Sequence, residues 1–252
     1  MSFAVSADAY GRFMGTFAEP LASQFAACLR LAPGQRALDV GCGPGALTAV
    51  LVAGLGAGSV SAIDPSESFV AAVGERLPGV DVRGGMAEAL PWPDDTFDRT
   101  AAQLVVHFMT DPVAGLAEMA RVTRPGGTVG VTVWDFAGGA GPVSLFWRAV
   151  RMVDPAASDE SDLPGTAEGQ LADLLGQAGL RAIESTALTV NVGFPSFEQW
   201  WEPFTLGVGP AGNYLAGLDD QRRASLRDAC AEMLADVPFT VSARSWTALG
   251  QV

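Results

Sequence analysis

Apolar residues recur along this chain in two alternating patterns, one typical of helices and the other of short buried strands. Over residues 6–31 large apolar side chains return every four positions, which predicts one long amphipathic helix. Arg36–Val40 and Ser59–Ile63 are short and almost uniformly apolar, as strands buried on both faces of a sheet are. Because strand-like and helix-like runs keep alternating as far as Trp134, we expect right-handed strand–helix–strand units and a mostly parallel sheet.

The same patterns set the expected limits of each element. We expect strands over residues 36–40, 59–63, 80–83, 97–103, 128–134, 182–192 and 238–247. We expect helices over residues 6–31, 46–53, 66–77, 112–123, 143–153 and 166–178, with partly helical, aromatic chain over 196–236. Asp111 followed by Pro112 is typical of a helix start, and Arg124–Gly127 is expected to form a tight turn.

Three segments follow from this order of elements. Residues 1–35 are expected to form a helical N-terminal segment. Residues 36–195 together with 237–252 should form one α/β domain. Residues 196–236 are then a helical, aromatic-rich cap inserted between the last two strands.

Composition and charge narrow the classes of function. The 252 residues are 49% hydrophobic and 17% charged, enough apolar content for a sizeable core. The net charge of -13 argues against nucleic-acid partners, which require a basic face. Three scattered cysteines indicate neither a disulfide framework nor a zinc site. We see no signal-peptide pattern and expect a cytoplasmic protein.

One uncharged stretch could be mistaken for a membrane span. Residues 40–63 contain no charged side chain. Six glycines and Pro44 divide this stretch into pieces too short to cross a bilayer. We therefore interpret it as strand, turn, helix, turn and strand, and we expect no membrane association.

The segment from Leu38 to Gly45 carries the strongest chemical signal. Its glycines allow a sharp turn and close approach of a ligand, and the helix behind it suits a carboxylate or a phosphate. Asp64 ends the neighbouring strand, where its carboxylate can accept from two ribose hydroxyls. Gly41, Gly43 and Ala46 also satisfy the dinucleotide fingerprint, so the loop alone leaves the ligand open.

Four stretches follow one another along the chain: LDVGCGPG (38–45), AIDPS (62–66), GMAEALPWPDDTFD (85–98) and ARVTRPGGTV (120–129). Together they resemble the motifs of class I S-adenosylmethionine-dependent methyltransferases, in particular the small-molecule, type 11-like group. The resemblance implies S-adenosyl-L-methionine as cofactor and an α/β, Rossmann-like fold. Such a fold has a seven-stranded, mostly parallel sheet with helices on both faces and an antiparallel last strand, here with a helical cap.

The resemblance also implies a set of cofactor-binding residues. They are Tyr10, Asp39, Gly41, Cys42, Gly43, Gly45, Asp64, Pro65, Met86, Ala87, Glu88 and Gln103. By this resemblance Asp39 and the glycine loop would hold the methionine end. Asp64 would bind the ribose hydroxyls, with Pro65 beside the adenine.

The remaining positions are expected around the adenine and the methionine amino group. The resemblance implies that Ala87 and Glu88 lie along the adenine edge and that Gln103 lies near the amino group. Many relatives carry an aspartate where this chain has Met86, so the contact to the adenine amino group is either missing or made by the backbone. His107, the only histidine, is either a general base or substrate partner, or a structural residue at a helix start.

The acceptor side is indicated by aromatic residues. Candidate substrate contacts are Phe13, Met14, Trp134, Trp200, Trp201 and Phe204. These side chains would line an apolar pocket, or pack the N-terminal segment and the cap, or form a dimer face. Tyr10 with its neighbours could close over the cofactor as a lid. We expect no metal site, because nothing fixes the geometry of the acidic residues around Asp159.

Three functions remain open at this point. The first is methyl transfer to a small metabolite by a monomer or homodimer. The second is an NAD(P)-dependent oxidoreductase, which would use the same glycine loop. The third is a non-catalytic protein that binds S-adenosylmethionine.

Overall fold

A computed structural model describes residues 7–234 and 238–252. Its seven strands are β1 (Ala37–Val40), β2 (Val60–Asp64), β3 (Asp81–Gly84), β4 (Phe97–Gln103), β5 (Thr123–Trp134), β6 (Arg181–Phe194) and β7 (Phe239–Gln251). They form one sheet in the order β3-β2-β1-β4-β5-β7-β6. β7 runs antiparallel to both β5 and β6, and the other pairs are parallel. The predicted sheet is confirmed, including its antiparallel last strand.

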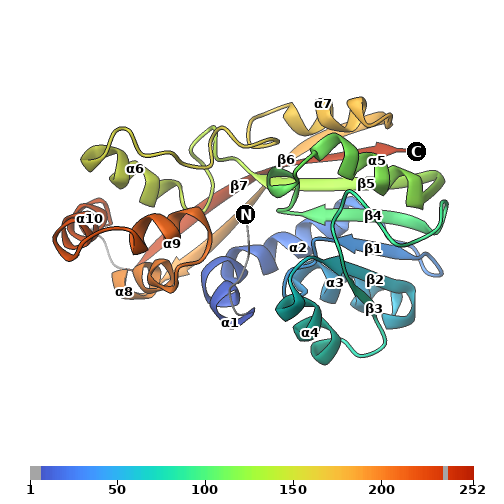
Figure 1. The fold of residues 1–252 in the computed structure, drawn as a ribbon, viewed down its shortest axis with the longest axis horizontal. Helices are drawn as coiled ribbons and strands as arrows, with labels where there is room; N and C mark the ends of the chain where they lie inside the picture. Colours follow the sequence, from blue (N-terminus) through green and yellow to red (C-terminus); the bar gives the residue numbers. More distant parts are fainter. Residues whose placement is uncertain (1–6, 235–237) are drawn as a thin grey trace.

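Helices cover both faces of the sheet (Figure 1). The helices around the sheet are α1 (Ala7–Tyr10), α2 (Thr16–Cys28), α3 (Ala46–Leu55), α4 (Glu67–Arg76), α5 (Pro112–Val122) and α7 (Gln170–Gln177), with short 3-10 turns η2 (Ala57–Ser59) and η3 (Val106–Phe108). In Figure 1, α5 and α7 lie on one face, while α2, α3 and α4 lie on the other. Asp111 begins α5 as predicted, because its Oδ1 accepts from Ala114 N at 3.0 Å and Pro112 takes the first helical position.

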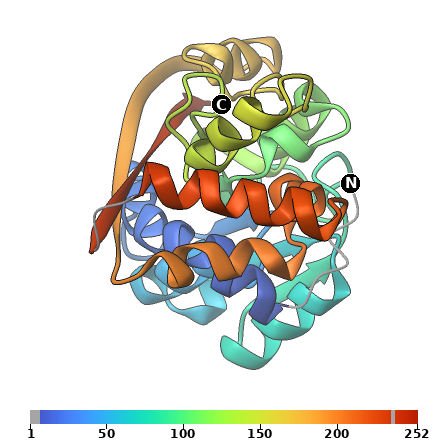
Figure 2. The same ribbon diagram turned by 90° about the vertical axis from the view of Figure 1, so that its left-hand side faces the viewer.

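A second group of helices extends beyond the end of the sheet. It consists of α6 (Ser144–Val153), α8 (Phe197–Trp201), the 3-10 turn η4 (Glu202–Leu206), α9 (Gly209–Ala216) and α10 (Asp220–Met233). We call α8 to α10 the cap; these helices lie between β6 and β7 in the chain. Seen end-on, α10 crosses in front of the sheet and runs beside α9 (Figure 2). Residues 235 and 236 of the expected cap lie outside the described residues.

The cap half is held together by a single apolar cluster. We call it the aromatic cluster, and it includes buried aliphatic side chains such as Leu104, Val143 and Leu215. Its buried rings are Phe13, Phe17, Trp134, Phe146, Trp147, Phe194, Phe197, Trp200, Trp201 and Phe204. Phe146 stacks on Phe204 with ring centroids 4.6 Å apart. The loop after β5 is fixed from the sheet side, because Asp135 accepts from Arg244 Nε at 2.8 Å and Nη2 at 2.5 Å. Rings from the N-terminal segment, β5, α6 and the cap therefore meet in one core.

The limits of several elements differ from those expected, including β7, which runs to Gln251, and three of the differences have a local reason. The helix expected over 6–31 is divided by a π-helical turn, η1 (Gly11–Gly15), and ends at Cys28. The helix expected from Thr166 begins at Gln170, after Gly169 in a left-handed conformation (φ 84°). β5 begins at Thr123 rather than Thr128, because Thr123 already pairs with Phe97 and the tight turn is absorbed into the strand.

Candidate functional site

A cavity of about 560 Å³ opens at the carboxyl ends of β1, β2 and β4. This is the place where the strand order reverses, since β1 has β2 on one side and β4 on the other. It is lined by Tyr10, Gly41, Gly43, Asp64, Pro65, Ser66, Glu67, Ser68, Phe69, Gly85, Met86, Ala87, Glu88, Gln103, Leu104, Val105, Phe108 and Met109. We call it the large cavity. Its volume is typical of a site for a cofactor-sized small molecule.

The glycine loop forms one wall of this cavity with its backbone. Gly41, Gly43 and Gly45 all have positive φ angles, of 69°, 52° and 92°. The N–H of Gly41 donates to the carbonyl of Ile63 at 2.8 Å, which ties the loop to β2. A Cβ on Gly41 would lie 2.6 Å from Cγ1 of Val105. Glycine is therefore required at position 41 for both conformation and space.

Asp64 is fixed between two backbone donors. Its Oδ2 accepts from Gly43 N at 2.8 Å, and its Oδ1 accepts from Ser66 N at 2.9 Å. Burial raises the pKa of Asp64, and these two N–H groups oppose that rise. Each oxygen keeps a second lone pair for a ligand hydroxyl. The strand end and the next helix start thus orient one carboxylate into the large cavity.

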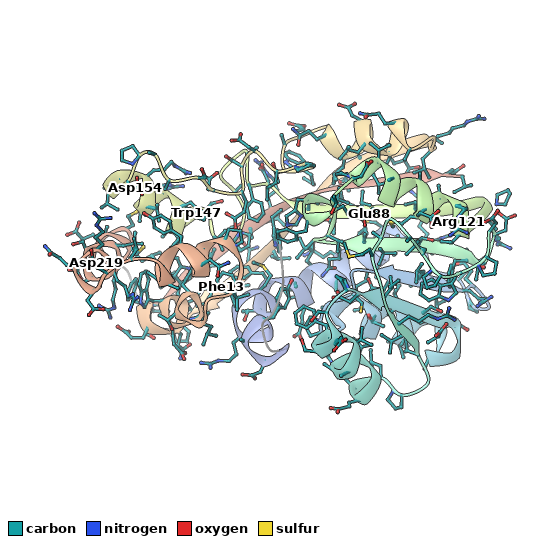
Figure 3. The ribbon with its side chains drawn as sticks, in the orientation of Figure 1. Phe13, Glu88, Arg121, Trp147, Asp154 and Asp219 are labelled. Atoms are coloured by element: carbon teal, nitrogen blue, oxygen red, sulfur yellow. The ribbon has the colours of Figure 1, made fainter. Side chains whose placement is uncertain are left out.

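The large cavity is negatively charged. Asp64, Glu67 and Glu88 line it, and no lysine or arginine occurs among its described lining residues. Glu88 is oriented by Oε1, which accepts from the N–H groups of Thr110 and Asp111 at 2.8 and 3.3 Å. Figure 3 shows Glu88 on the sheet half of the molecule. Such a site favours a cationic ligand and repels an anionic one such as a diphosphate.

Two polar side chains near the strand ends have an unused acceptor. Nε2 of Gln103 donates to the carbonyl of Ala18 at 3.0 Å, and Oδ2 of Asp39 accepts from Thr48 Oγ1 at 2.6 Å. Within the described part of the chain, the second oxygen of each side chain is buried without a partner. Burial also raises the pKa of Asp39 to about 7. Gln103 lines the large cavity, so its oxygen suits a ligand donor such as an ammonium group.

The N-terminal segment covers the cavity and contacts the cap. The Tyr10 ring lines the cavity and packs edge-on against Phe69 of α4, with centroids 5.4 Å apart. Burial, then the nearby Asp64 charge, raise the pKa of Tyr10, so its hydroxyl stays protonated. Arg12 forms an ion pair with Glu202 of η4. The segment thus bridges the large cavity and the cap.

Nine of the expected cofactor-binding residues line the large cavity and three do not. Those that do are Tyr10, Gly41, Gly43, Asp64, Pro65, Met86, Ala87, Glu88 and Gln103. Asp39 lies behind the loop on Thr48, Cys42 is buried beside Ala62 and Val73, and Gly45 begins α3. These three residues shape the loop from behind rather than line the cavity.

Several lining residues were not singled out from the sequence. Ser66, Glu67 and Ser68 directly follow the AIDPS stretch, so their position at the strand end could have indicated them. Leu104 and Val105 follow β4 and have no distinctive residue type. Ser66 occupies the N-cap position of α4, but its hydroxyl pairs with Ser68 Oγ at 2.9 Å instead of capping the helix.

His107 lies in η3 and is not among the residues that line the large cavity. Its ring packs against Phe108 and Phe136, with centroids 3.9 and 5.9 Å away. Burial lowers its pKa to about 3, which leaves the imidazole neutral. This placement favours the structural interpretation of His107, and its role as a base stays a prediction without geometric support.

The expected substrate residues gather around a second, smaller space. A cavity of about 50 Å³, which we call the small cavity, is lined by Arg12, Phe13, Met14, Thr16, Phe17, Pro142, Val143, Phe194, Gln199, Trp200, Pro203 and Phe204. Trp134 and Trp201 belong to the same aromatic cluster without lining this cavity. Figure 3 shows Phe13 beside the cap helices. None of the six expected side chains is among those that line the large cavity.

Neither a metal cluster nor a membrane-spanning helix occurs among the described residues. Over residues 7–234 and 238–252 no group of three histidine, cysteine, aspartate or glutamate side chains is placed to hold a metal ion. Among the described helices none is long and apolar enough to cross a membrane.

Comparisons with known proteins agree with this geometry. Residues 38–131 match the family model described as "Methyltransferase domain". The chain is 34% identical over 168 residues to an uncharacterized protein of Mycobacterium tuberculosis, covering 62% of this chain and 58% of that protein. It is 42% identical over 102 residues to a demethylmenaquinone methyltransferase of Mycobacterium sp. strain KMS, covering 40% of this chain and 42% of that protein. The matched segments thus span about half the length of these curated relatives.

Solved structures show the same fold at low sequence identity. An S-adenosylmethionine-dependent methyltransferase from Thermotoga maritima superposes with a TM-score of 0.57 at 19% identity, covering 96% of this chain and 95% of that one. The cyclase SpnF superposes with a TM-score of 0.55 at 23% identity, covering 92% of this chain and 80% of that one. Since the neighbours include a cyclase, the fold alone does not define the reaction.

Proposed function

We propose that this chain is a class I methyltransferase that transfers the methyl group of S-adenosylmethionine to a small, partly apolar metabolite; the match of residues 38–131 to the methyltransferase domain supports the proposal. The observation that carries the proposal is the charge of the large cavity, where Asp64, Glu67 and Glu88 are accompanied by no lysine or arginine among the described lining residues. A sulfonium cofactor is attracted to such a site. The diphosphate of NAD(P) is repelled by it.

The residues of this chain fit such a cofactor in three places. Asp64, held by two N–H groups, suits the ribose hydroxyls. The backbone of the glycine loop and the unpaired oxygen of Gln103 suit the carboxylate and the ammonium group of the methionine end. Met86 is 45% exposed at the cavity and offers the adenine amino group no side-chain oxygen, so the adenine edge is left to the backbone and Glu88.

The chemistry and the protein have separate tasks in this proposal. S-adenosylmethionine, when bound, supplies a sulfonium methyl group that is open to in-line displacement. The chain binds the cofactor at the strand ends, orients the acceptor from the cap side and excludes water with Tyr10 and Phe69. An acceptor that is already a nucleophile requires no protein base, so the position of His107 does not oppose the proposal.

The aromatic cluster supports a partly apolar acceptor. Phe13, Trp200 and Phe204 line the small cavity together with the polar side chains of Arg12 and Gln199. Aromatic walls with a few polar groups are typical of small-molecule sites, and a space of about 50 Å³ admits only a small part of an acceptor. The similarity to demethylmenaquinone methyltransferases is consistent with an acceptor of this kind. The net charge of -13 opposes a nucleic-acid acceptor.

Calorimetric titration tests the cofactor. We expect binding of S-adenosylmethionine and S-adenosylhomocysteine, and none of NAD or NADP, at the same protein concentration. The preference for S-adenosylmethionine over its uncharged-sulfur product should shrink as salt screens the three carboxylates. Binding of NAD(P) alone would contradict the proposal.

A second assay tests methyl transfer itself. S-adenosylhomocysteine should accumulate when the protein is incubated with S-adenosylmethionine and a panel of small aromatic and isoprenoid alcohols and amines. The comparison with a cyclase makes this assay necessary, because a related fold carries a different reaction. Cofactor binding without product from any acceptor class would favour the non-catalytic alternative.

A further inference from the structure

One residue belongs both to the wall of the large cavity and to the aromatic cluster. Leu104 lines the large cavity, and it is also a buried member of the aromatic cluster. Phe17 and Val143 of that same cluster line the small cavity. Among the described side chains that line the large cavity, Leu104 is the only fully buried one in this cluster. Leu104 therefore belongs both to the wall of the large cavity and to the cluster that supplies the walls of the small cavity.

The backbone of Leu104 is held in an unfavourable conformation. Its φ of 63° lies in the left-handed region, which a leucine rarely adopts. The N–H of Leu104 donates to the carbonyl of Thr132 at 2.8 Å, which fixes the residue at the end of β4 against β5. Three other described non-glycine residues have a positive φ, and none of them lines either cavity. Backbone strain of this kind concentrates at functional sites.

We propose that Leu104 is the specificity-determining residue that separates the cofactor site from the acceptor site. This inference rests on the proposed function. In-line displacement requires the acceptor atom to reach the cofactor, and the acceptor enters from the side of the cap. Leu104 adopts its left-handed conformation at the end of β4, and its buried side chain belongs to the aromatic cluster. The size of this side chain then sets how bulky an acceptor can be at the point of transfer.

A matched pair of variants tests this role. Leu104→Ala removes the partition, while Leu215→Ala makes the same change in the same cluster at a buried position that lines neither the large nor the small cavity. Each variant, loaded with S-adenosylhomocysteine, is titrated with 2-naphthol as a flat, mostly apolar probe. We expect Leu104→Ala to bind 2-naphthol about tenfold more tightly than the unchanged protein, because an apolar space opens beside the small cavity. Leu215→Ala should change this affinity by less than about twofold.

Cofactor binding is measured in the same samples and separates the two proposals. Binding of S-adenosylhomocysteine with no gain of 2-naphthol affinity in Leu104→Ala overturns the partition and leaves the proposed function standing. An equal gain in both variants also overturns it, since that would be a general loosening of the cluster. If the unchanged protein binds neither S-adenosylmethionine nor S-adenosylhomocysteine, the proposed function fails first.

A glycine variant keeps the test valid if Leu104→Ala does not fold. Leu104→Gly removes the same side chain and relieves the left-handed conformation, so it should melt at a higher temperature than Leu104→Ala. It should show the same gain in 2-naphthol affinity. A folded Leu104→Gly protein without that gain overturns the proposal even if Leu104→Ala does not fold.

Discussion

The large cavity and the cap lie on opposite sides of the N-terminal segment, and they are built from different kinds of contact. The shape of the large cavity is set mainly by the main chain, through the Gly41–Gly45 loop and the N–H groups that hold Asp64. The shape of the small cavity is set by side chains, through stacked and edge-on rings such as Phe146 on Phe204. Under the proposed function, one region would recognise its ligand by fixed polar geometry, and the other by the shape that its side chains leave.

This difference predicts how the two regions tolerate change. A backbone-built site fails when one residue alters a turn or a hydrogen bond, because no neighbour can supply the missing geometry. A side chain-built core can repack around substitutions of similar volume while the fold is retained. We therefore expect the acceptor site to vary more easily than the cofactor site.

The largest expected effect comes from removing one ring on each side. The ring centroids of Phe204 and Phe13 are 5.2 Å apart, and those of Phe69 and Tyr10 are 5.4 Å apart. Phe204 and Phe69 are both buried. Phe204→Ala and Phe69→Ala should each lower the free energy of unfolding by about 3–5 kcal/mol. Only Phe69→Ala should also weaken S-adenosylmethionine binding, because Phe69 lines the large cavity.

Chemical denaturation and calorimetry on the two proteins measure these quantities. If Phe204→Ala weakens cofactor binding as much as Phe69→Ala does, the two regions are not separate in the way described. The N-terminal segment would then transmit the loss from the cap to the large cavity.

A second test concerns a buried acid on the cap side. Glu160 lies in the loop after α6; burial raises its pKa to about 7, and its Oε2 has no partner among the described residues. Because the folded-state pKa is raised, the protonated Glu160 carboxyl stabilises the folded protein relative to the ionised one. This contribution to the free energy of unfolding is complete below the ordinary pKa of the carboxyl and is lost as pH rises through about 7. Between pH 4.5 and pH 8 the free energy of unfolding of the unchanged protein should thus fall by about 3 kcal/mol more than that of Glu160→Gln.

Unfolding free energies at the two pH values check this expectation. Asp162→Asn is the control, since it removes a carboxylate from an exposed position in the same loop. Asp39 in the cofactor half is also a buried acid with a raised pKa, but it is present in all three proteins and cancels in the difference. A Glu160→Gln protein with the pH dependence of the unchanged protein would contradict the assignment.

The smallest of the three effects is the most local. Asp64→Asn keeps the shape of the side chain but places an NH2 group against one of the two backbone donors that hold it. We expect S-adenosylmethionine binding to weaken by about 2 kcal/mol, or roughly 30-fold. Glu67→Gln removes the same charge from an exposed lining residue and should change binding by only about twofold.

These two variants separate the contribution of charge to cofactor binding from the contribution of hydrogen-bond geometry. Equal losses in both would mean that the large cavity acts through its total charge alone. A loss confined to Asp64→Asn would place the recognition in the fixed hydrogen bonds, as the comparison of the two regions requires.

The sequence predicted much of the lining of the large cavity, because its signals are local. A glycine with positive φ, an aspartate at a strand end and a proline after an N-cap each report the conformation of their own short segment. Gly41 and Asp64 could therefore be assigned before any contact was known. The parallel part of the sheet followed from the alternation of strand-like and helix-like runs, since connections of that kind have one preferred hand, whereas the antiparallel last strand was implied by the family resemblance.

The rest depended on contacts between distant parts of the chain. Nothing local marks Leu104, whose position follows from the Thr132 carbonyl that holds it and from the aromatic cluster to which it belongs. The π-helical turn at Gly11–Gly15 and the ion pair of Arg12 with Glu202 are equally invisible without the fold. Aromatic residues at helical spacing are compatible with several packings, so the two cavities could not be separated from sequence alone.

The strands that carry the cap have a consequence for how such a protein diversifies. β6 and β7 are neighbours in the sheet, and Phe194 at the end of one is paired directly with Phe239 at the start of the other. The cap therefore leaves the sheet at the end of β6 and rejoins it at the adjacent start of β7, so that it forms the long connection of a β-hairpin. An insertion of different length or sequence that starts and ends at the same two points is compatible with the same pairing of β6 and β7. If the proposed function is right, the acceptor specificity of such a protein can therefore change through this one insertion while the glycine loop and Asp64 stay in place.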